Sequence, residues 1–233
     1  LIAKKLLLEK NQSVLDIGCG WGGMAAHIYK KSDANVVGVT LSEEQIAYAE
    51  QRKIREKLDK VEYRLQDYRN VNEKYDRIVS VGMFEHVGTA HYQEFFNKVY
   101  DLLNDNGVAL IHTIGRLNEP GTTDPWIDKY IFPGGYIPAL SETVSRAEKS
   151  GLSMTDIQIL KFHYAETLKR WRYNFYENLD KVKEIYDEKF CRMWDFYLSS
   201  SQASFEESTL VVFQLQLSKN KKTVPDKRDY LLA

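Results

Sequence analysis

The ten residues VLDIGCGWGG, at positions 14–23, constrain the fold of this chain more than any other stretch. An apolar run that contains one acidic residue, Asp16, passes directly into three glycines, Gly18, Gly20 and Gly22. Because glycine lacks a Cβ, the backbone at these positions can turn tightly and approach a ligand closely. The pattern predicts a buried strand, a glycine turn and the start of a helix, with a ligand against the turn.

The spacing of the glycines restricts the kind of ligand. It differs from the GxGxxG spacing of dinucleotide-binding turns, and no lysine of the P-loop type follows it, so a nucleoside triphosphate is not expected. A carboxylate inside the strand suits a cofactor that carries a positive amino group better than it suits a pyrophosphate. We therefore predict S-adenosylmethionine beside Asp16, Gly18 and Gly20. A tight turn without a ligand is the structural alternative.

Apolar, β-branched runs alternate with segments of helical periodicity along the rest of the chain, which predicts a parallel α/β sheet. The clearest helix is expected over residues 90–104, where apolar side chains recur every three to four positions until Asn106 and Gly107 end the pattern. The expected strands are 14–18, 35–40, 61–65, 77–82, 108–113, 155–160 and 208–217.

Two segments interrupt this alternation. Residues 115–138 are rich in glycine, proline and aromatic side chains, and a loop of this length in a compact domain is usually a lid or a binding loop. Residues 164–198 form a helical stretch that is unusually crowded with aromatic side chains. We expect these two segments to stand outside the regular α/β framework.

Polar side chains follow the second and third predicted strands. Thr40 ends the second strand, and Gln45 lies one turn into the helix that Ser42 is expected to cap. Asp67 and Tyr68 follow the third strand, where a carboxylate can accept from an amine and an aromatic ring can flank a base. Ligands of doubly wound sheets lie across the carboxyl ends of the strands, so we expect these residues around the cofactor. A helix cap for Gln45 and a solvated turn for Asp67 are the alternatives.

The bulk composition excludes several classes of protein. Lys+Arg total 32 against Asp+Glu 33, so nothing in the composition suggests nucleic-acid binding. Two cysteines, Cys19 and Cys191, give no disulfide framework, and no apolar run approaches the length of a membrane span. We expect a cytoplasmic protein. The opening LIAKKLLLEKNQ reads as a helix entered midway, and we expect a further N-terminal part before it.

At this point the chain resembles a known family. Five stretches between residues 14 and 138 resemble the cyclopropane-fatty-acyl-phospholipid synthases and the mycolic acid cyclopropane synthases: VLDIGCGWGG, GVTLSEEQ, DRIVSVGMFEHVG, LIHTIG and DPWIDKYIFPGGYIP. The likeness as a whole runs from Leu1 to about Leu232. The resemblance implies an α/β fold, the class I (Rossmann-like) S-adenosylmethionine-dependent methyltransferase sheet. It implies a single domain over 1–233 with a helical lipid-binding insertion at about 164–200.

The resemblance also implies site residues. The family binds a bicarbonate ion, and the residues that hold it match Glu85 of FEHVG, His112 of HTIG, Tyr164 of HYAET and the backbone amide of Ile114. For S-adenosylmethionine, the matching positions are Gly18, Gly20, Thr40, Gln45, Asp67 and Tyr68.

Two departures from the family pattern matter. Relatives carry a Tyr-Ser-Cys segment upstream whose cysteine backbone contacts the anion, and that segment is not part of this sequence. Many relatives carry a cysteine in the YLxxC stretch, where this sequence reads YLSSS and places Ser201. A thiol nucleophile at that position is therefore not part of the expected mechanism.

The expected reaction is methylene transfer from S-adenosylmethionine to a cis double bond of an unsaturated phospholipid acyl chain, which gives a cyclopropane fatty acid. An isolated alkene is a weak nucleophile, so it needs a strong electrophile held close and in line. Bicarbonate would act as the general base, with Glu85 as an acceptor that orients it and with His112 and Tyr164 donating to it. If the strand geometry continues to this point, His86 points the other way, and it is expected to be structural. The bland alternatives are a surface Glu-His pair, a core histidine and a helix aromatic.

Other functions stay open at this stage. A related methyltransferase could make a methyl-branched lipid or N-methylate a small amine, and a non-catalytic module that binds lipid or cofactor is the alternative of another class. We expect peripheral contact with the inner face of a membrane, no nucleic-acid partner, and either a monomer or a homodimer. His86 and His91 lack the HExxH spacing, so no metal site is expected.

Overall fold

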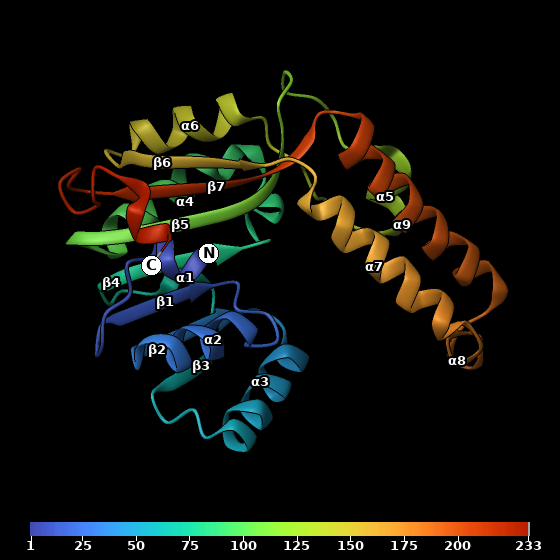
Figure 1. Cartoon of the computed structure of the whole chain (residues 1–233), viewed down its shortest axis with the longest axis horizontal. Helices are drawn as coiled ribbons and strands as arrows, with labels where there is room; N and C mark the ends of the chain where they lie inside the picture. Colours follow the sequence, from blue (N-terminus) through green and yellow to red (C-terminus); the bar gives the residue numbers. More distant parts are fainter. Residues whose placement is uncertain (233) are drawn as a thin grey trace.

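The computed structural model describes residues 1–232 and shows one seven-stranded sheet with helices on both faces (Figure 1). The strand order is β3-β2-β1-β4-β5-β7-β6. The strands are β1 Ser13–Ile17, β2 Asn35–Thr40, β3 Val61–Leu65, β4 Tyr75–Val81, β5 Leu103–Arg116, β6 Ser153–Leu160 and β7 Leu210–Ser218. All seven predicted strands are present, and the α/β prediction is confirmed.

The prediction of a purely parallel sheet is wrong for one strand. β1 to β5 pair in parallel, whereas β7 runs antiparallel to both β5 and β6. The reason lies in the chain path, because β7 starts where β5 ends: the Leu117 N–H donates to the Thr209 carbonyl at 3.0 Å. A strand that enters the sheet at its carboxyl edge must run back against its neighbour.

Four helices cover the faces of the sheet: α2 Gly23–Ser32, α3 Glu43–Glu56, α4 Tyr92–Leu102 and α6 Leu140–Lys149. α4 buries Phe95, Phe96 and Val99 in the larger of the two sheet cores. The helix expected over 90–104 ends at Leu102, because Leu103 already pairs with Tyr75 as part of β5. The pairing of the strand overrides the helical periodicity there.

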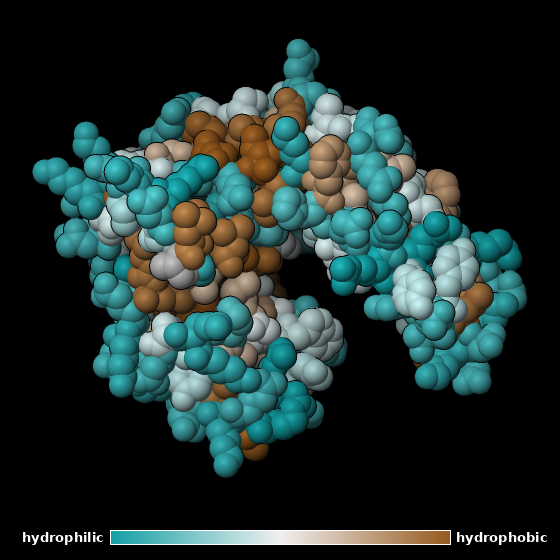
Figure 2. Space-filling model, in the orientation of Figure 1, coloured by the Kyte–Doolittle hydropathy of each residue, from teal (hydrophilic) through white to brown (hydrophobic). Residues whose placement is uncertain are grey.

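The segment expected as one helical insertion is broken into three helices: α7 His163–Glu177, α8 Leu179–Ile185 and α9 Glu188–Glu207. α7 and α9 pack on each other and project from the sheet as a helical arm, residues 163–207 (Figure 1). Leu168, Leu198 and Phe205 are buried in a core of its own. Figure 2 shows the molecule hollowed between this arm and the part of the body that carries α3.

The loop expected over 115–138 contains one short helix, α5 Pro125–Tyr130, which Asp124 caps by accepting from the backbone N–H groups of Trp126 and Ile127. Short 3-10 turns η1 Tyr68–Asn70, η2 Phe84–His86 and η3 Thr89–His91 follow β3 and β4. Near the two ends of the chain, α1 Ile2–Lys5 and η4 Arg228–Leu231 contact each other. Within residues 1–232, no helix has the length and apolar character needed to cross a membrane.

Candidate active site

The carboxyl ends of β1, β2 and β3 lie side by side. The Gly18 and Cys19 N–H groups both donate to the Val39 carbonyl at 3.0 Å, and the Gln66 N–H donates to the Thr40 carbonyl at 3.0 Å. The glycine turn, the end of β2 and the segment after β3 therefore share one edge of the sheet. This edge is where the sequence places the cofactor.

The glycine turn has the backbone geometry that the sequence predicts. Gly18 and Gly20 have φ of 77° and 53°, a region that side chains disfavour. A Cβ at Gly18 would lie 2.8 Å from Met83, whereas one at Gly20 would meet nothing within 4 Å. Gly18 therefore allows the turn that follows β4 to approach closely, and the backbone at Gly20 faces open space in which a ligand can lie against it.

Asp16 is the buried acid of this half of the site. Its side chain is 1% exposed, and its Oδ2 atom has no hydrogen-bond partner in the described part of the chain. Burial raises the pKa of this carboxyl to about 7, and the backbone amide of Ala25 opposes that shift. An unpaired buried carboxylate oxygen at the glycine turn fits a cofactor with a cationic amino group.

The other four cofactor candidates lie at the same edge, with partners of their own. The Thr40 hydroxyl donates to Gln45 Oε1 at 2.8 Å, and the Gln45 N–H donates to the Ser42 hydroxyl at 3.2 Å. Only half of the expected capping box forms, because the Gln45 side chain reaches Thr40 instead of the backbone of Ser42.

Asp67 and Tyr68 are tied to the protein locally. The Arg69 guanidinium forms an ion pair with the Asp67 carboxylate at 2.7 Å, and this contact holds the pKa of that carboxyl below its usual range. This is the contact that a solvated turn makes. The Tyr68 ring packs edge-on against Phe95 at 5.6 Å, which leaves it half-buried beside the core.

The four residues matched to the anion lie on the wall of one cavity. Glu85 comes from η2, His112 and Ile114 from β5, and Tyr164 from the first turn of α7. The cavity has a volume of about 1480 Å³. The sheet holds η2 close to β5, because Val81, the last residue of β4 before η2, pairs with His112 of β5.

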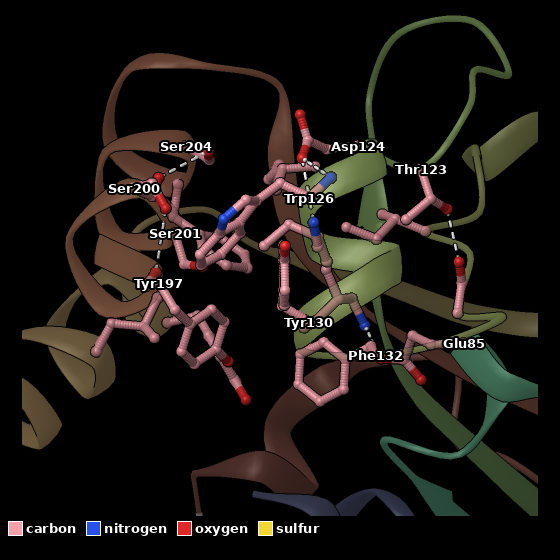
Figure 3. A pocket seen from close by; sticks show the side chains of 18 of the residues that line it. Glu85, Thr123, Asp124, Trp126, Tyr130, Phe132, Tyr197, Ser200, Ser201 and Ser204 are labelled. Atoms are coloured by element: carbon pink, nitrogen blue, oxygen red, sulfur yellow. Dashed lines mark hydrogen bonds between the residues drawn. The ribbon is translucent and has the colours of Figure 1, made fainter. Parts of the chain in front are cut away.

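Glu85 is the buried acid of the cavity that carries the residues matched to the anion. Its Oε1 accepts from the backbone N–H of Ile114 at 2.6 Å, and its Oε2 is buried with no partner among residues 1–232. Burial raises the pKa of the carboxyl. The Ile114 amide thus donates to Glu85 itself in this structure, and an anion at that amide would have to share it with the carboxylate. Figure 3 shows Glu85 at the cavity wall, below Thr123.

His86 does not point the other way. β4 ends at Val81 and Glu85 and His86 lie in a 3-10 turn, so the alternation of a strand does not apply to them. His86 is exposed, lines the same cavity, and has its ring 6.1 Å from that of Phe132. The expectation of a purely structural histidine rested on strand geometry that ends five residues earlier, at Val81.

His112 and Tyr164 are both neutral in this setting. Burial, together with a smaller effect from the charge of Lys5, lowers the pKa of His112 to about 4. Burial raises the pKa of Tyr164, and the charge of Glu85 raises it further, which keeps the phenol protonated. The Tyr164 ring is fixed by Phe205, 5.1 Å away, and by Trp171, 6.0 Å away.

Aromatic and hydroxyl side chains form the remaining walls of the cavity. Trp126 of α5 packs edge-on against Phe196 of α9 at 4.8 Å, which joins the loop to the arm. Ser200, Ser201 and Ser204 of α9 face the cavity opposite α5 (Figure 3). Ser201, at the position where many relatives carry a cysteine, therefore lines the cavity. The sequence did not single out Phe196, whose helical spacing also fits an ordinary core position.

Among the described residues, no group of three or more His, Cys, Asp or Glu side chains is arranged to hold a metal ion.

The strand order, the glycine turn and the buried acid of β1 define the fold of S-adenosylmethionine-dependent methyltransferases. Two solved structures agree. The cyclopropane synthase MmaA2 from Mycobacterium tuberculosis superposes with a TM-score of 0.86 at 33% identity, over 94% of this chain and 82% of that one. The mycolic acid cyclopropane synthase CmaA1, complexed with SAH and CTAB, gives 0.85 at 32% identity, over 91% and 80%.

Sequence comparisons also identify the family to which the chain belongs. The family model for mycolic acid cyclopropane synthetase matches residues 1–215, and the chain belongs to this family. The cyclopropane-fatty-acyl-phospholipid synthase of Escherichia coli K12 is 40% identical over 219 residues, which cover 94% of this chain. The chain spans only 56% of that enzyme's length. The resemblance described above is confirmed.

Proposed function

We propose that this protein transfers a methylene group from S-adenosylmethionine to a cis double bond of an unsaturated phospholipid acyl chain, which yields a cyclopropane fatty acid. The observation that carries the proposal is the meeting of Glu85, His112 and Tyr164 on one aromatic-lined cavity. The cavity adjoins the cofactor edge, because Met83 touches the glycine turn at Gly18 and Glu85 follows two residues later. The 40% identity to the Escherichia coli synthase supports it.

The cavity suits an acyl chain in size and lining. A volume of about 1480 Å³ exceeds the usual range for small-molecule sites, and most of its wall is apolar. Trp126, Phe132 and Phe196 present ring faces or edges to it. Aromatic faces steady positive charge, and a dry wall keeps water from a cationic lipid chain.

The residues around Glu85 fit a bound bicarbonate. Bicarbonate would supply a base that removes a proton from the transferred carbon, and S-adenosylmethionine would supply the electrophilic methyl group. Glu85 Oε2 is a buried acceptor without a partner, which matches the hydroxyl of bicarbonate. The neutral His112 ring and the Tyr164 phenol supply donors for its oxygens. These side chains would orient the anion and exclude water around it.

A methyl-branched lipid is the second candidate product. One relative, the probable fatty acid methyltransferase of Pseudomonas putida, is 36% identical over 92% of this chain. Formation of a methyl-branched lipid by this protein would use the same cavity and the same methyl donor. N-methylation of a small amine is less suited to a cavity of this volume, and a non-catalytic module leaves the cluster of Glu85, His112 and Tyr164 without a use.

Membrane contact belongs to the same proposal. An acyl chain reaches the cavity only from a bilayer or a carrier, so we propose peripheral binding at the cytoplasmic face. A homodimer is compatible with this arrangement but is not required by it.

The test incubates the full-length protein with vesicles of an unsaturated phospholipid and S-adenosylmethionine, followed by mass spectrometry of the lipids. We expect a product heavier by one methylene whose acyl chain resists ozonolysis. A product that is still cleaved by ozone retains an alkene and would support the methyl-branched alternative. Binding of S-adenosylmethionine without any lipid product would support the non-catalytic module.

Substitution at the anion site is the first prediction. Glu85→Ala or His112→Ala should lower the rate of ring formation by on the order of 10²- to 10⁴-fold, because each removes a contact to the base. Affinity for the cofactor should stay within about twofold, since neither residue lies at the glycine turn. Calorimetry with S-adenosylhomocysteine separates the two readouts, and equal losses in both would indicate a structural role.

A further inference from the structure

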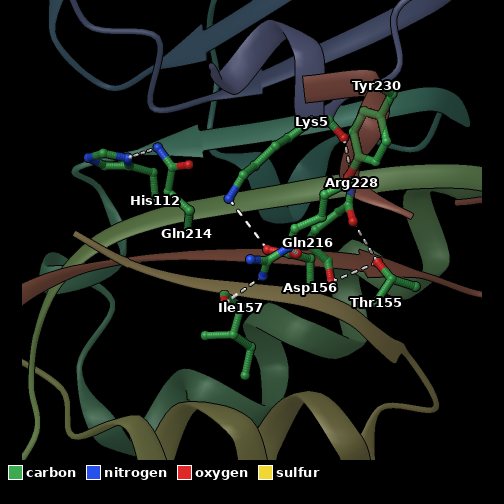
Figure 4. Close-up of polar contacts among 9 residues, drawn as sticks. All are labelled: Lys5, His112, Thr155, Asp156, Ile157, Gln214, Gln216, Arg228 and Tyr230. Atoms are coloured by element: carbon green, nitrogen blue, oxygen red, sulfur yellow. Dashed lines mark hydrogen bonds and ion pairs between the residues drawn. The ribbon is translucent and has the colours of Figure 1, made fainter. Parts of the chain in front are cut away.

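Gln214 lies directly behind His112. The two residues face each other in the antiparallel register of β5 and β7, and Gln214 Nε2 lies 3.2 Å from His112 Nδ1. Figure 4 shows the contact between the Gln214 amide nitrogen and the His112 ring as a dashed line. Gln214 is 2% exposed, whereas His112 lines the cavity. The glutamine therefore contacts the reaction site only through the histidine.

The chemistry of this contact sets the proton on the ring. In the orientation that the amide has here, its nitrogen faces the ring and can only donate, which makes Nδ1 the unprotonated acceptor of the imidazole. In a neutral imidazole the other nitrogen, Nε2, then carries the hydrogen. The orientation leaves Gln214 Oε1 buried with no partner among residues 1–232. A buried, half-satisfied amide in a mostly apolar strand calls for a reason beyond packing.

The charges around His112 favour the same state. Lys5 is fully buried, forms an ion pair with Asp156 at 3.5 Å, and its charge disfavours a protonated His112 (Figure 4). Glu85 and Tyr164 are the titratable groups of the anion site itself. The other titratable and charged side chains that line the cavity are His86, Arg116, Asp124, Tyr130, Tyr136, Asp187, Lys189, Arg192 and Tyr197. A neutral glutamine adds no charge that would draw a second proton onto the ring, whereas a carboxylate at this position would.

We propose that Gln214 is a positioning residue that holds His112 as the neutral tautomer with hydrogen on Nε2, so that the ring donates one hydrogen bond to an anion in the cavity. The role of the anion rests on the proposed function, but the state of the ring does not. Gln214 acts in the way that outer partners of ligating histidines act, by fixing the tautomer and the plane of the ring.

The direct test is nitrogen-15 NMR of the histidine rings in the full-length protein without substrate. His112→Gln assigns the signal. We expect hydrogen on Nε2 of the parent throughout about pH 5 to 8. Gln214→Leu should give a mixture of the two tautomers. Gln214→Glu, which has nearly the same shape, should draw hydrogen onto Nδ1 and bring the titration of the ring into this range.

The activity arms use the same variants. Gln214→Leu should lower kcat on the order of 10- to 100-fold with unchanged affinity for S-adenosylhomocysteine. Gln214→Glu should lose activity as pH rises through the new pKa of His112, because the neutral ring then carries its hydrogen on Nδ1 and offers no donor to the cavity. The matched control is Gln158→Leu, since Gln158 lies opposite Gln214 on the β6 side of β7. It should change neither the tautomer nor kcat.

The outcomes separate the two proposals. Hydrogen on Nδ1 of the parent, or an unchanged tautomer in Gln214→Leu, overturns the role of Gln214 whatever the enzyme makes. The expected tautomers together with no cyclopropane product would leave that role in place and overturn the proposed function.

Discussion

At the scale of single residues, Asp16 and Glu85 share the same hydrogen-bonding arrangement. Each is a buried carboxylate with one oxygen held by a backbone amide and the other without a protein partner. Such an oxygen costs about 1–3 kcal/mol when nothing binds it. The two unpaired oxygens lie on the two halves of the site, one at the glycine turn and one in the cavity. We infer that each is completed by a ligand of its own, a cationic amine at Asp16 and a hydroxyl donor at Glu85.

Asp16→Asn tests the first half. Loss of the charge should weaken S-adenosylhomocysteine binding by about 10- to 100-fold, because a hydrogen bond to a charged group contributes roughly 1.5–3 kcal/mol. Isothermal calorimetry measures the affinity. Asp33→Asn is the control, since Asp33 is a partly exposed acid that pairs with Lys60 beyond the far end of α2. Equal affinities of Asp16→Asn and the parent would contradict the assignment.

The same residue gives a pH dependence without ligand. The pKa of Asp16 rises from 3.8 to about 7 on folding, so the folded state holds this proton more tightly than the unfolded state. Stability from this group is therefore complete below about pH 4 and is lost as pH rises towards 7. Urea unfolding should show a decline of at most about 4 kcal/mol over this range from this group. Asp16→Asn should flatten that part of the curve, and an unchanged slope would refute the shift.

At the scale of elements, the sequence predicted the sheet far better than the arm. Period-two and apolar patterns report local burial, so every strand was found. The direction of β7 depends on where α9 delivers the chain, which no local pattern reports. The breaks at Asn178 and between Ile185 and Glu188 fall in a stretch that stays helical in composition. Glu85, His112 and Tyr164 came from motifs, whereas Gln214 becomes recognisable only when β7 is placed against β5.

Two neighbours on α9 separate the stability of the arm from its function. Leu198 is fully buried in the core of the arm, so Leu198→Ala should lower the free energy of unfolding by about 2–5 kcal/mol. Phe196 is 56% exposed and lines the cavity, so Phe196→Ala should leave stability nearly unchanged and raise KM for the lipid. Thermal unfolding and lipid kinetics measure the two effects. A stability loss in Phe196→Ala as large as in Leu198→Ala would show that the wall of the cavity is structural.

At the scale of the whole molecule, charge is local rather than global. The net charge is −1, which gives no overall attraction to an anionic bilayer. Yet Lys189 and Arg192 are exposed on α9 and line the cavity that is proposed to receive the acyl chain. A lipid that enters there would carry its phosphate past these two cations. Binding to vesicles should therefore depend on this pair more than on the total charge.

The double variant Lys189→Gln, Arg192→Gln tests this arrangement in the full-length protein. Each basic residue near an anionic surface contributes about 1 kcal/mol, so the affinity for anionic vesicles should fall by roughly 10- to 30-fold at low salt. The difference from the parent should shrink as salt screens the contact. Lys221→Gln, Lys222→Gln removes the same charge just beyond the end of β7, where the strand leaves the opposite edge of the sheet, and should change little. Equal losses from the two pairs in vesicle sedimentation would mean that total charge, and not the mouth of the cavity, governs contact with the membrane.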